Sequence, residues 1–173
     1  RIAHRVTAST GGIDCRIAFH AHATDPARWL CRMKLMLKTT DERIEPALSV
    51  LEDLLFSVDP RDRKRLQEIL TQAVAWHRTE LVQSGSETAT RRARRGITPI
   101  GRLSEEMSGL PQLTLSEAAL KGFDREGERL MEKIEAIRNF LLARGRLTAS
   151  FTGSDAACRT VRSVLHGWIG RMR

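Results

Sequence analysis

The stretch Gln83–Leu115, QSGSETATRRARRGITPIGRLSEEMSGLPQLTL, decides how the rest of the chain is organised. It combines a polar break, a run of four arginines, a helical segment interrupted by glycine and a Gly-Leu-Pro turn. The patterns on either side are simpler, because apolar residues alternate upstream and recur at helical spacing elsewhere. The function assigned to the chain therefore depends on the purpose of this stretch.

Upstream of this stretch, alternating apolar residues predict three consecutive antiparallel strands. Apolar residues occupy every second position in Cys15–Ala21 and in Trp29–Leu37, which is typical of strands with one buried face. The pair Gly11-Gly12 suggests a turn after an earlier strand over Ala3–Ser9. Together these segments form a predicted meander.

Apolar residues at helical spacing predict that helices make up most of the remainder. Leu147–Thr152 is the exception, because its alternation predicts a fourth strand. Asp59-Pro60 and Ser154 carry the signals of helix starts. The predicted helices cover Ile44–Leu55, Asp59 to Gly85, Asp124 to Gly145, and Ser154 to the end of the chain.

This order of elements predicts an α+β fold. The expected sheet is antiparallel with about four strands, the three-strand meander plus the late strand, and the helices pack on one of its faces. A chain of 173 residues predicts one domain, residues 1–173. Because Arg1 already lies in a predicted strand, we expect this domain to be a fragment of a larger multidomain protein.

Composition permits several partners and excludes few. The 29 basic and 21 acidic residues leave a net charge of +8, which favours anionic partners in general. No apolar run is long enough for a membrane span, and no secretory signal is visible, so we expect no membrane association. Cys15, Cys31 and Cys158 form no metal-binding pattern, and we expect reduced thiols in the core and a cytoplasmic or other reducing soluble compartment.

Two histidine patterns could hold a metal, and neither is complete. His20 and His22 fall on one side of a strand, without a third ligand at a suitable spacing. His77-Arg78-Thr79-Glu80 begins like the inverted zinc-peptidase motif HxxEH, but Leu81 stands where the second histidine is needed. We therefore assign no catalytic, cofactor-binding or metal-binding residue.

The arginine cluster, defined as Arg91, Arg92, Arg94 and Arg95, is the clearest binding candidate. Its spacing gathers positive charge along one side of a helix. An independent module that binds nucleic acid or an acidic partner through Arg91–Arg95 is therefore one hypothesis. The lack of tyrosine, the few aromatic residues and the neighbouring acidic residues argue against nucleic acid and favour a solvated face. An unrecognised hydrolase ranks last, since no nucleophile motif is visible.

Several local phrases resemble the pitrilysin/insulinase family of zinc metallopeptidases, and most closely its presequence-protease branch. The resemblance covers most of the chain, although each phrase is short. The phrases are TGGI (Thr10–Ile13), KLMLKTTDERIEPALSVLEDLL (Lys34–Leu55), DPRDRKRLQEILTQ (Asp59–Gln72), SGSETATRRA (Ser84–Ala93), LSEEMSGLPQL (Leu103–Leu113) and FTGSD (Phe151–Asp155).

The resemblance implies a specific function. Members of the family close two bowl-like halves around a chamber in which unfolded peptides are cut, with zinc on an HxxEH motif in the first of four related domains. This chain resembles the associated segment in the third domain, so it is expected to be non-catalytic, forming chamber wall and inter-domain surface, with zinc only in the parent protein. Gly85-Ser86 departs from the Gly-His usual in the branch.

The resemblance also implies which partners to expect. The other domains of the same peptidase and the unfolded peptide substrate are the expected partners. The related domain begins with a helix and a strand upstream of the position of Arg1, which predicts an incomplete sheet edge here. Such an edge exposes unpaired backbone groups, so we expect self-association through it.

Overall fold

The computed structural model describes residues 2–25 and 27–172, which are mostly helical. Its contacts divide the chain into two compact units, and each is described here by itself. Unit 1 contains the described residues of 1–16, 33–59 and 134–173, and unit 2 contains those of 17–32 and 60–133. The prediction of one domain over residues 1–173 stays a prediction.

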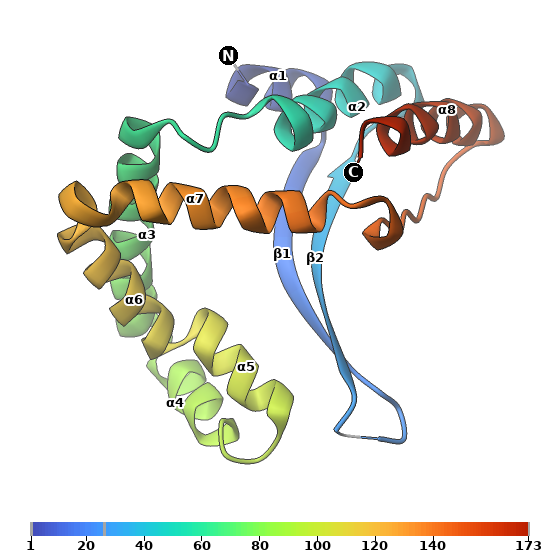
Figure 1. Ribbon diagram of the computed structural model, residues 1–173. Coiled ribbons are helices and arrows are strands. Elements are labelled where there is room, and N and C mark those ends of the chain that lie inside the picture. The colour runs from blue at the N-terminus through green and yellow to red at the C-terminus, as the bar shows by residue number, and fades with distance from the viewer. Residues whose placement is uncertain (1, 26, 173) are drawn as a thin grey trace. The chain divides into compact units, whose positions relative to one another are not determined.

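Unit 1 is built around the pair α2 (Ile44–Glu52) and α8 (Asp155–Arg171), which lie side by side in Figure 1. Apolar residues at helical spacing bury one face of each helix. The core consists of Ile44, Leu48, Ala157 and Trp168, with Leu37, Val161, Val164 and Leu165 among the residues packed against it. Ser154 caps α8 by accepting a hydrogen bond from the Ala157 amide, as its sequence predicts.

The remaining elements of unit 1 extend this pair. Helix α1 (Ile2–Ser9) packs against α2, where the Arg5 guanidinium donates to the Asp53 carboxylate and to the Ser49 hydroxyl. Short helical turns precede and follow α2, and a further turn precedes the segment that leads to α8. These turns are η1 (Asp41–Arg43), the π-helical η2 (Asp53–Ser57) and η3 (Arg144–Arg146).

Arg138 ties the end of η2 to the second half of α7 (Phe123–Leu141). Its Nε and Nη2 both donate to the Leu55 carbonyl, at 3.2 and 2.9 Å, and its Nη1 donates to the Val58 carbonyl at 3.0 Å. Carbonyl groups at the end of a helical segment have no partner within that segment. The planar guanidinium of Arg138 donates to both of these carbonyl groups.

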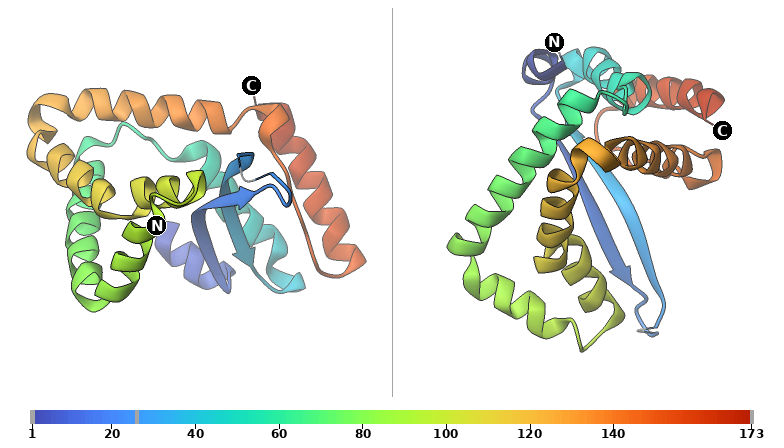
Figure 2. Two further views of the ribbon diagram at one scale, coloured as in Figure 1. Left: turned by 90° about the horizontal axis from the view of Figure 1, so that it is seen from below. Right: turned by 60° about the vertical axis from the view of Figure 1, so that its left-hand side comes forward.

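Unit 2 is a helical layer in which α6 contacts both α3 and α5 (Figure 2). Asp62, rather than the expected Asp59, caps α3 by accepting from the Arg65 amide. Thr98 and Pro99 start α5 in the same way. The helices are α3 (Arg63–Gln83), α4 (Gly85–Arg94), α5 (Pro99–Ser108), α6 (Leu110–Lys121) and the first part of α7.

A single antiparallel hairpin of β1 (Gly12–Ala21) and β2 (Trp29–Lys38) is the sheet of the described chain. At the turn end of the hairpin, the His22 amide donates to the Arg28 carbonyl at 2.9 Å. At the start of β1, Gly12 has a φ of +132°, a backbone conformation that favours glycine. The preceding Gly11 amide donates to the Lys38 carbonyl. Within the described residues, β1 and β2 pair only with each other.

The prediction of an α+β fold with about four strands is wrong. Residues Ala3–Ser9 belong to helix α1, since the Arg5 side chain and the Ala8 carbonyl both bond to the α2 region. Leu147–Thr152 belongs to no strand, because alternation alone supplies no partner for its backbone groups. The two middle strands are confirmed.

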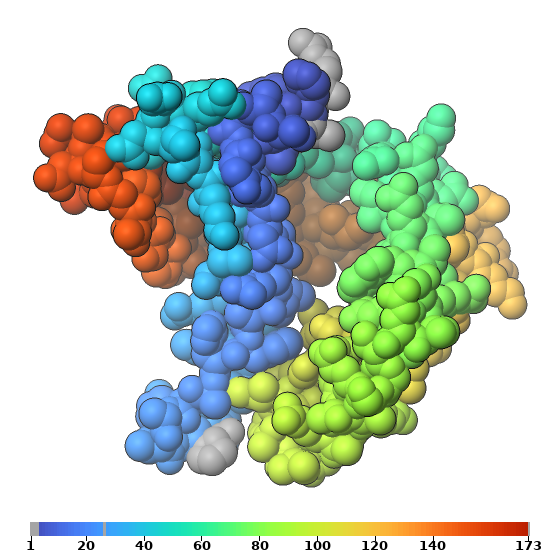
Figure 3. All heavy atoms as spheres, turned by 180° about the vertical axis from the view of Figure 1, so that it is seen from behind, coloured from blue at the N-terminus to red at the C-terminus, as the bar shows by residue number. Residues whose placement is uncertain are grey.

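The expectation that the three cysteines lie in the core is wrong for the two in the hairpin. Cys15 and Cys31 are exposed, and Cys158 is partly buried. Figure 3 shows the hairpin atoms, in blue, at the molecular surface, and Ile17, Trp29 and Met33 expose 45%, 40% and 42% of their surface. No described helix combines the length and the apolarity needed to cross a membrane.

Candidate functional site

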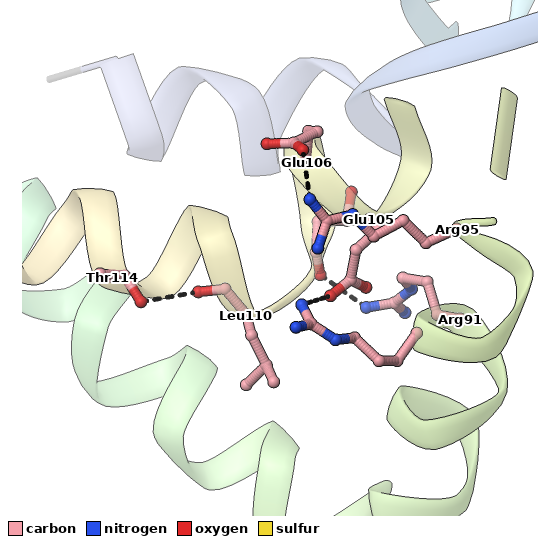
Figure 4. Close-up of polar contacts among 8 residues, drawn as sticks. Arg91, Arg95, Glu105, Glu106, Leu110 and Thr114 are labelled. Atoms are coloured by element: carbon pink, nitrogen blue, oxygen red, sulfur yellow. Dashed lines mark hydrogen bonds and ion pairs between the residues drawn. The ribbon is translucent and has the colours of Figure 1, made fainter. Parts of the chain in front are cut away.

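The arginine cluster lies on α4 and its C-terminal cap, facing α5. Figure 4 shows contacts of the cluster with α5. Arg91 Nη1 donates to the Ser108 carbonyl at the end of α5, at 2.5 Å, and its Nη2 lies 3.5 Å from the Glu87 carboxylate. The Arg91 side chain is only 20% exposed. It therefore serves to close the last turn of α5.

Glu105 is the most unusual residue of this region, because its side chain is fully buried. Arg92 Nη1 donates to Glu105 Oε1 at 3.1 Å, while Oε2 has no hydrogen-bond partner among the described residues. Gly109 makes room for this carboxylate, since a Cβ there would lie 2.2 Å from Oε2 and 2.6 Å from the Glu105 carbonyl oxygen. A buried carboxylate is costly unless it is paired, so Arg92 is a structural partner.

The other two arginines are closer to solvent. Arg95 Nη2 lies 3.5 Å from Glu106 Oε1, and both side chains are 41% exposed. Arg94 is exposed on the same helix. Three of the four arginines therefore bond to α5, and the cluster holds α4 against α5 rather than presenting four unpaired charges to a polyanion.

The histidine candidates do not assemble a metal site. His20 is exposed on β1, and His22 follows the end of that strand. His77 and Glu80 lie on α3 and, with Leu81 and Arg91, line a cavity of about 10 Å³, the size of one water molecule. His77 Nδ1 is buried and has no hydrogen-bond partner among the described residues. In residues 2–25 and 27–172, no group of three potential ligands comes together.

The surroundings of Cys15 on β1 change the acidity of its thiol. Partial burial, and secondly the neighbouring Asp14 carboxylate, raise the pKa of the Cys15 thiol. A raised pKa lowers the thiolate fraction at neutral pH, and the thiolate is the nucleophile. The arrangement therefore makes Cys15 less reactive and does not favour covalent catalysis.

Unit 1 contains a groove of about 400 Å³ that the sequence reasoning did not identify. The signal was present in α2, where Glu45, Leu48, Ser49 and Glu52 have the i, i+3, i+4 and i+7 spacing of one helix face. Thr160, Ser163 and Val164 of α8 form the other wall. Glu52 is already bonded to Arg171, so part of the acidic character of the groove is neutralised within the unit.

Comparisons with known proteins find one family model and relatives with presequence-protease names. A family model for the peptidase M-16C associated domain matches residues 1–118. A mitochondrial presequence protease of Yarrowia lipolytica (strain CLIB 122 / E 150) is 24% identical over 148 residues, which are 85% of this chain and 15% of that protein. Presequence protease 1, chloroplastic/mitochondrial, of Arabidopsis thaliana is 27% identical over 124 residues, covering 72% of this chain and 12% of that protein. The chain thus spans less than a sixth of the length of either relative.

Proposed function

Because this chain belongs to the peptidase M-16C associated family, we propose that it is a non-catalytic domain of a zinc-dependent metalloendopeptidase that degrades peptides. In that parent protein it forms part of the chamber wall and of the surface between domains. The observation that carries the proposal is the family match over residues 1–118, which includes the hairpin and the helices from α1 to α5. Both curated relatives have protease names and are several times longer than this chain.

The donor set supports placing zinc elsewhere in the parent. A catalytic zinc site uses three protein ligands and keeps a fourth position for water. His77 and Glu80 would supply two donors, and the position that the HxxEH motif gives to its second histidine is Leu81. The residues of this segment therefore do not fit a catalytic zinc ion, and no reaction step is assigned to them.

Exposed apolar residues on α3 support a role in contacts beyond this segment. Ile69 and Trp76 are seven positions apart, so they lie on one face of the helix, and they expose 46% and 61% of their surface. Large exposed aromatic residues are typical centres of protein contacts. An inter-domain surface or a wall that touches unfolded peptide would use this face.

The zinc assignment is tested in the full-length parent. We expect chelation to abolish its cleavage of an unstructured peptide, and zinc to restore it. The His77→Ala/Glu80→Gln double variant is expected to keep the zinc content and the activity of the parent. A variant that loses bound zinc while remaining folded by circular dichroism would show that this segment holds the metal, against the proposal.

The wall assignment needs a separate experiment. A substrate peptide with a photo-activatable cross-linker is irradiated on an inactive form of the full-length parent, and the attached sites are mapped by mass spectrometry. We expect cross-links within residues 1–173, and we expect excess unlabelled peptide to suppress them. Efficient cross-linking that falls entirely outside this segment would refute the wall assignment.

A further inference from the structure

We propose that the groove between α2 and α8 holds a lysine or arginine side chain from a part of the parent protein that lies outside residues 1–173. This inference rests on the proposed function, because it takes the chain to be one part of a longer peptidase. The groove lies within unit 1 and has a volume of about 400 Å³. That volume is typical of clefts that hold drug-sized ligands, so it is sufficient for one long side chain.

Part of the groove lining is apolar. Leu48 of α2 belongs to the buried core of unit 1, and Val164 of α8 packs against that core. Both residues also line the groove. The methylene groups of a lysine or arginine side chain can lie along such a surface while the charged end remains among polar groups. The apolar part of the lining therefore suits the stem of a long basic side chain.

The polar part of the lining selects a cation. It consists of the carboxylates of Glu45 and Glu52 and of three hydroxyl residues, and the described lining includes no lysine, arginine or histidine. Ionised carboxylates only accept hydrogen bonds, and hydroxyl oxygens can also accept. A charged group with several N–H donors, such as an ammonium or a guanidinium, matches this set of acceptors. An anionic group would meet like charge at both carboxylates.

Glu45 is the carboxylate that is available to the occupant. Glu52 is bonded to Arg171, and these are the last residues of α2 and α8, so this ion pair lies at the C-terminal ends of the two helices. Glu45 is seven residues earlier in α2, about 10 Å along the helix axis. It is exposed and has no ion-pair partner among the described residues. We therefore expect the charged end of the occupant beside Glu45.

Contacts within unit 1 favour a partner from the parent chain over a peptide substrate. The other two carboxylates along α2 and directly after it, Glu52 and Asp53, each bind a guanidinium from another element, Arg171 of α8 and Arg5 of α1. A basic residue of the parent at Glu45 would repeat this arrangement in every molecule, whereas peptide substrates differ in sequence. Most of the length of both relatives lies outside the part that this chain matches, so a parent of that length has ample chain to supply the residue.

Photo-cross-linking in the full-length parent identifies the occupant. The photoreactive residue p-benzoylphenylalanine replaces Ser163, which lines the groove, or Arg162, an exposed neighbour that does not and serves as the matched control. Mass spectrometry maps the attached segments after irradiation. From position 163 we expect attachment to a segment of the same polypeptide that lies outside residues 1–173 and contains a lysine or arginine. From position 162 we expect no attachment to that segment.

The other outcomes of this experiment overturn the proposal. They are attachment from position 163 only within residues 1–173, to a second copy of the parent, to an added substrate peptide, or to no protein at all. Peptide cleavage and zinc content are measured on the same preparation, so the proposed function is assessed separately. Zinc-dependent cleavage with attachment only inside residues 1–173 refutes this inference alone, and attachment to a basic outside segment in a parent without zinc refutes the zinc assignment alone.

A charge reversal tests the pairing with Glu45. We expect Glu45→Lys to lose the cross-link from position 163, because the new ammonium repels the charged end of the occupant. Glu42→Lys makes the same change of charge at an exposed residue outside the groove lining, and we expect it to keep the cross-link. Glutamate in place of the basic residue found by cross-linking is expected to recover the cross-link in the Glu45→Lys background. An undiminished cross-link in Glu45→Lys, or no recovery in the double variant, contradicts the pairing.

Discussion

Replacing Arg92 by alanine is expected to destabilise the α4–α5 region far more than replacing Arg94 on the same helix. Arg92 is the only described partner of the fully buried Glu105 carboxylate, at 3.1 Å. Removing one partner of a buried ion pair costs about 3–5 kcal/mol, and the 49% exposure of Arg92 places the expected loss near the lower limit, about 3 kcal/mol. Arg94→Ala removes the same charge from an exposed position and is expected to cost at most about 0.5 kcal/mol.

Urea unfolding followed by far-UV circular dichroism measures both losses, and amide hydrogen exchange of α4 and α5 localises them. Leucine at position 105 is the decisive control, because it removes the buried charge. Glu105→Leu in the Arg92→Ala background is expected to recover most of the lost stability. Equal losses for Arg92→Ala and Arg94→Ala, or no recovery in the double variant, would refute the structural assignment of Arg92.

Three further outcomes follow from local geometry. Gly109→Ala is expected to lower the free energy of unfolding in urea by about 1–3 kcal/mol, because the new methyl group meets the carboxylate and the carbonyl of Glu105. Gly85→Ala is the control: it has open space around it, and we expect it to be neutral or stabilising. Trp168→Ala is expected to lower the free energy of unfolding by about 3–5 kcal/mol, because Trp168 is 4% exposed and belongs to the core of unit 1. A loss of stability below about 1 kcal/mol would contradict that packing. Because the pKa of the Cys15 thiol is raised, its alkylation is expected to reach half its maximal rate at a higher pH than alkylation of a free cysteine. Asp14→Asn is expected to lower this midpoint pH. The measurement uses a variant without the other cysteines, and a midpoint that Asp14→Asn leaves unchanged there would exclude the carboxylate as a cause.

The sequence predicted those elements whose signals are local. Alternation was sufficient for β1 and β2, and the Ser154 cap was sufficient for the start of α8. Pro46 lies in the first turn of α2, where a proline costs least. Each of these features depends on residues close together in the chain.

The errors concern features that depend on distant partners. Ala3–Ser9 was predicted as a strand because Gly11-Gly12 resembles a turn, but the bonds from Arg5 to α2 stabilise a helix instead. The alternation in Leu147–Thr152 indicated a strand without indicating what would pair with it. Likewise the partners of the arginine cluster on α5 could not be inferred from charge alone, because nothing in the run identifies which acidic residue is buried beside it.

At Arg138, the effect of a substitution depends on the shape of the cationic group as well as on its charge. One guanidinium makes three bonds to two carbonyl groups, in a planar geometry that an ammonium group cannot reproduce. Lysine at this position would preserve the net charge and still leave carbonyl groups at the end of η2 without partners. A survey of functional variants of the parent would therefore find this position less permissive than the exposed arginine at 94, although both carry the same charge.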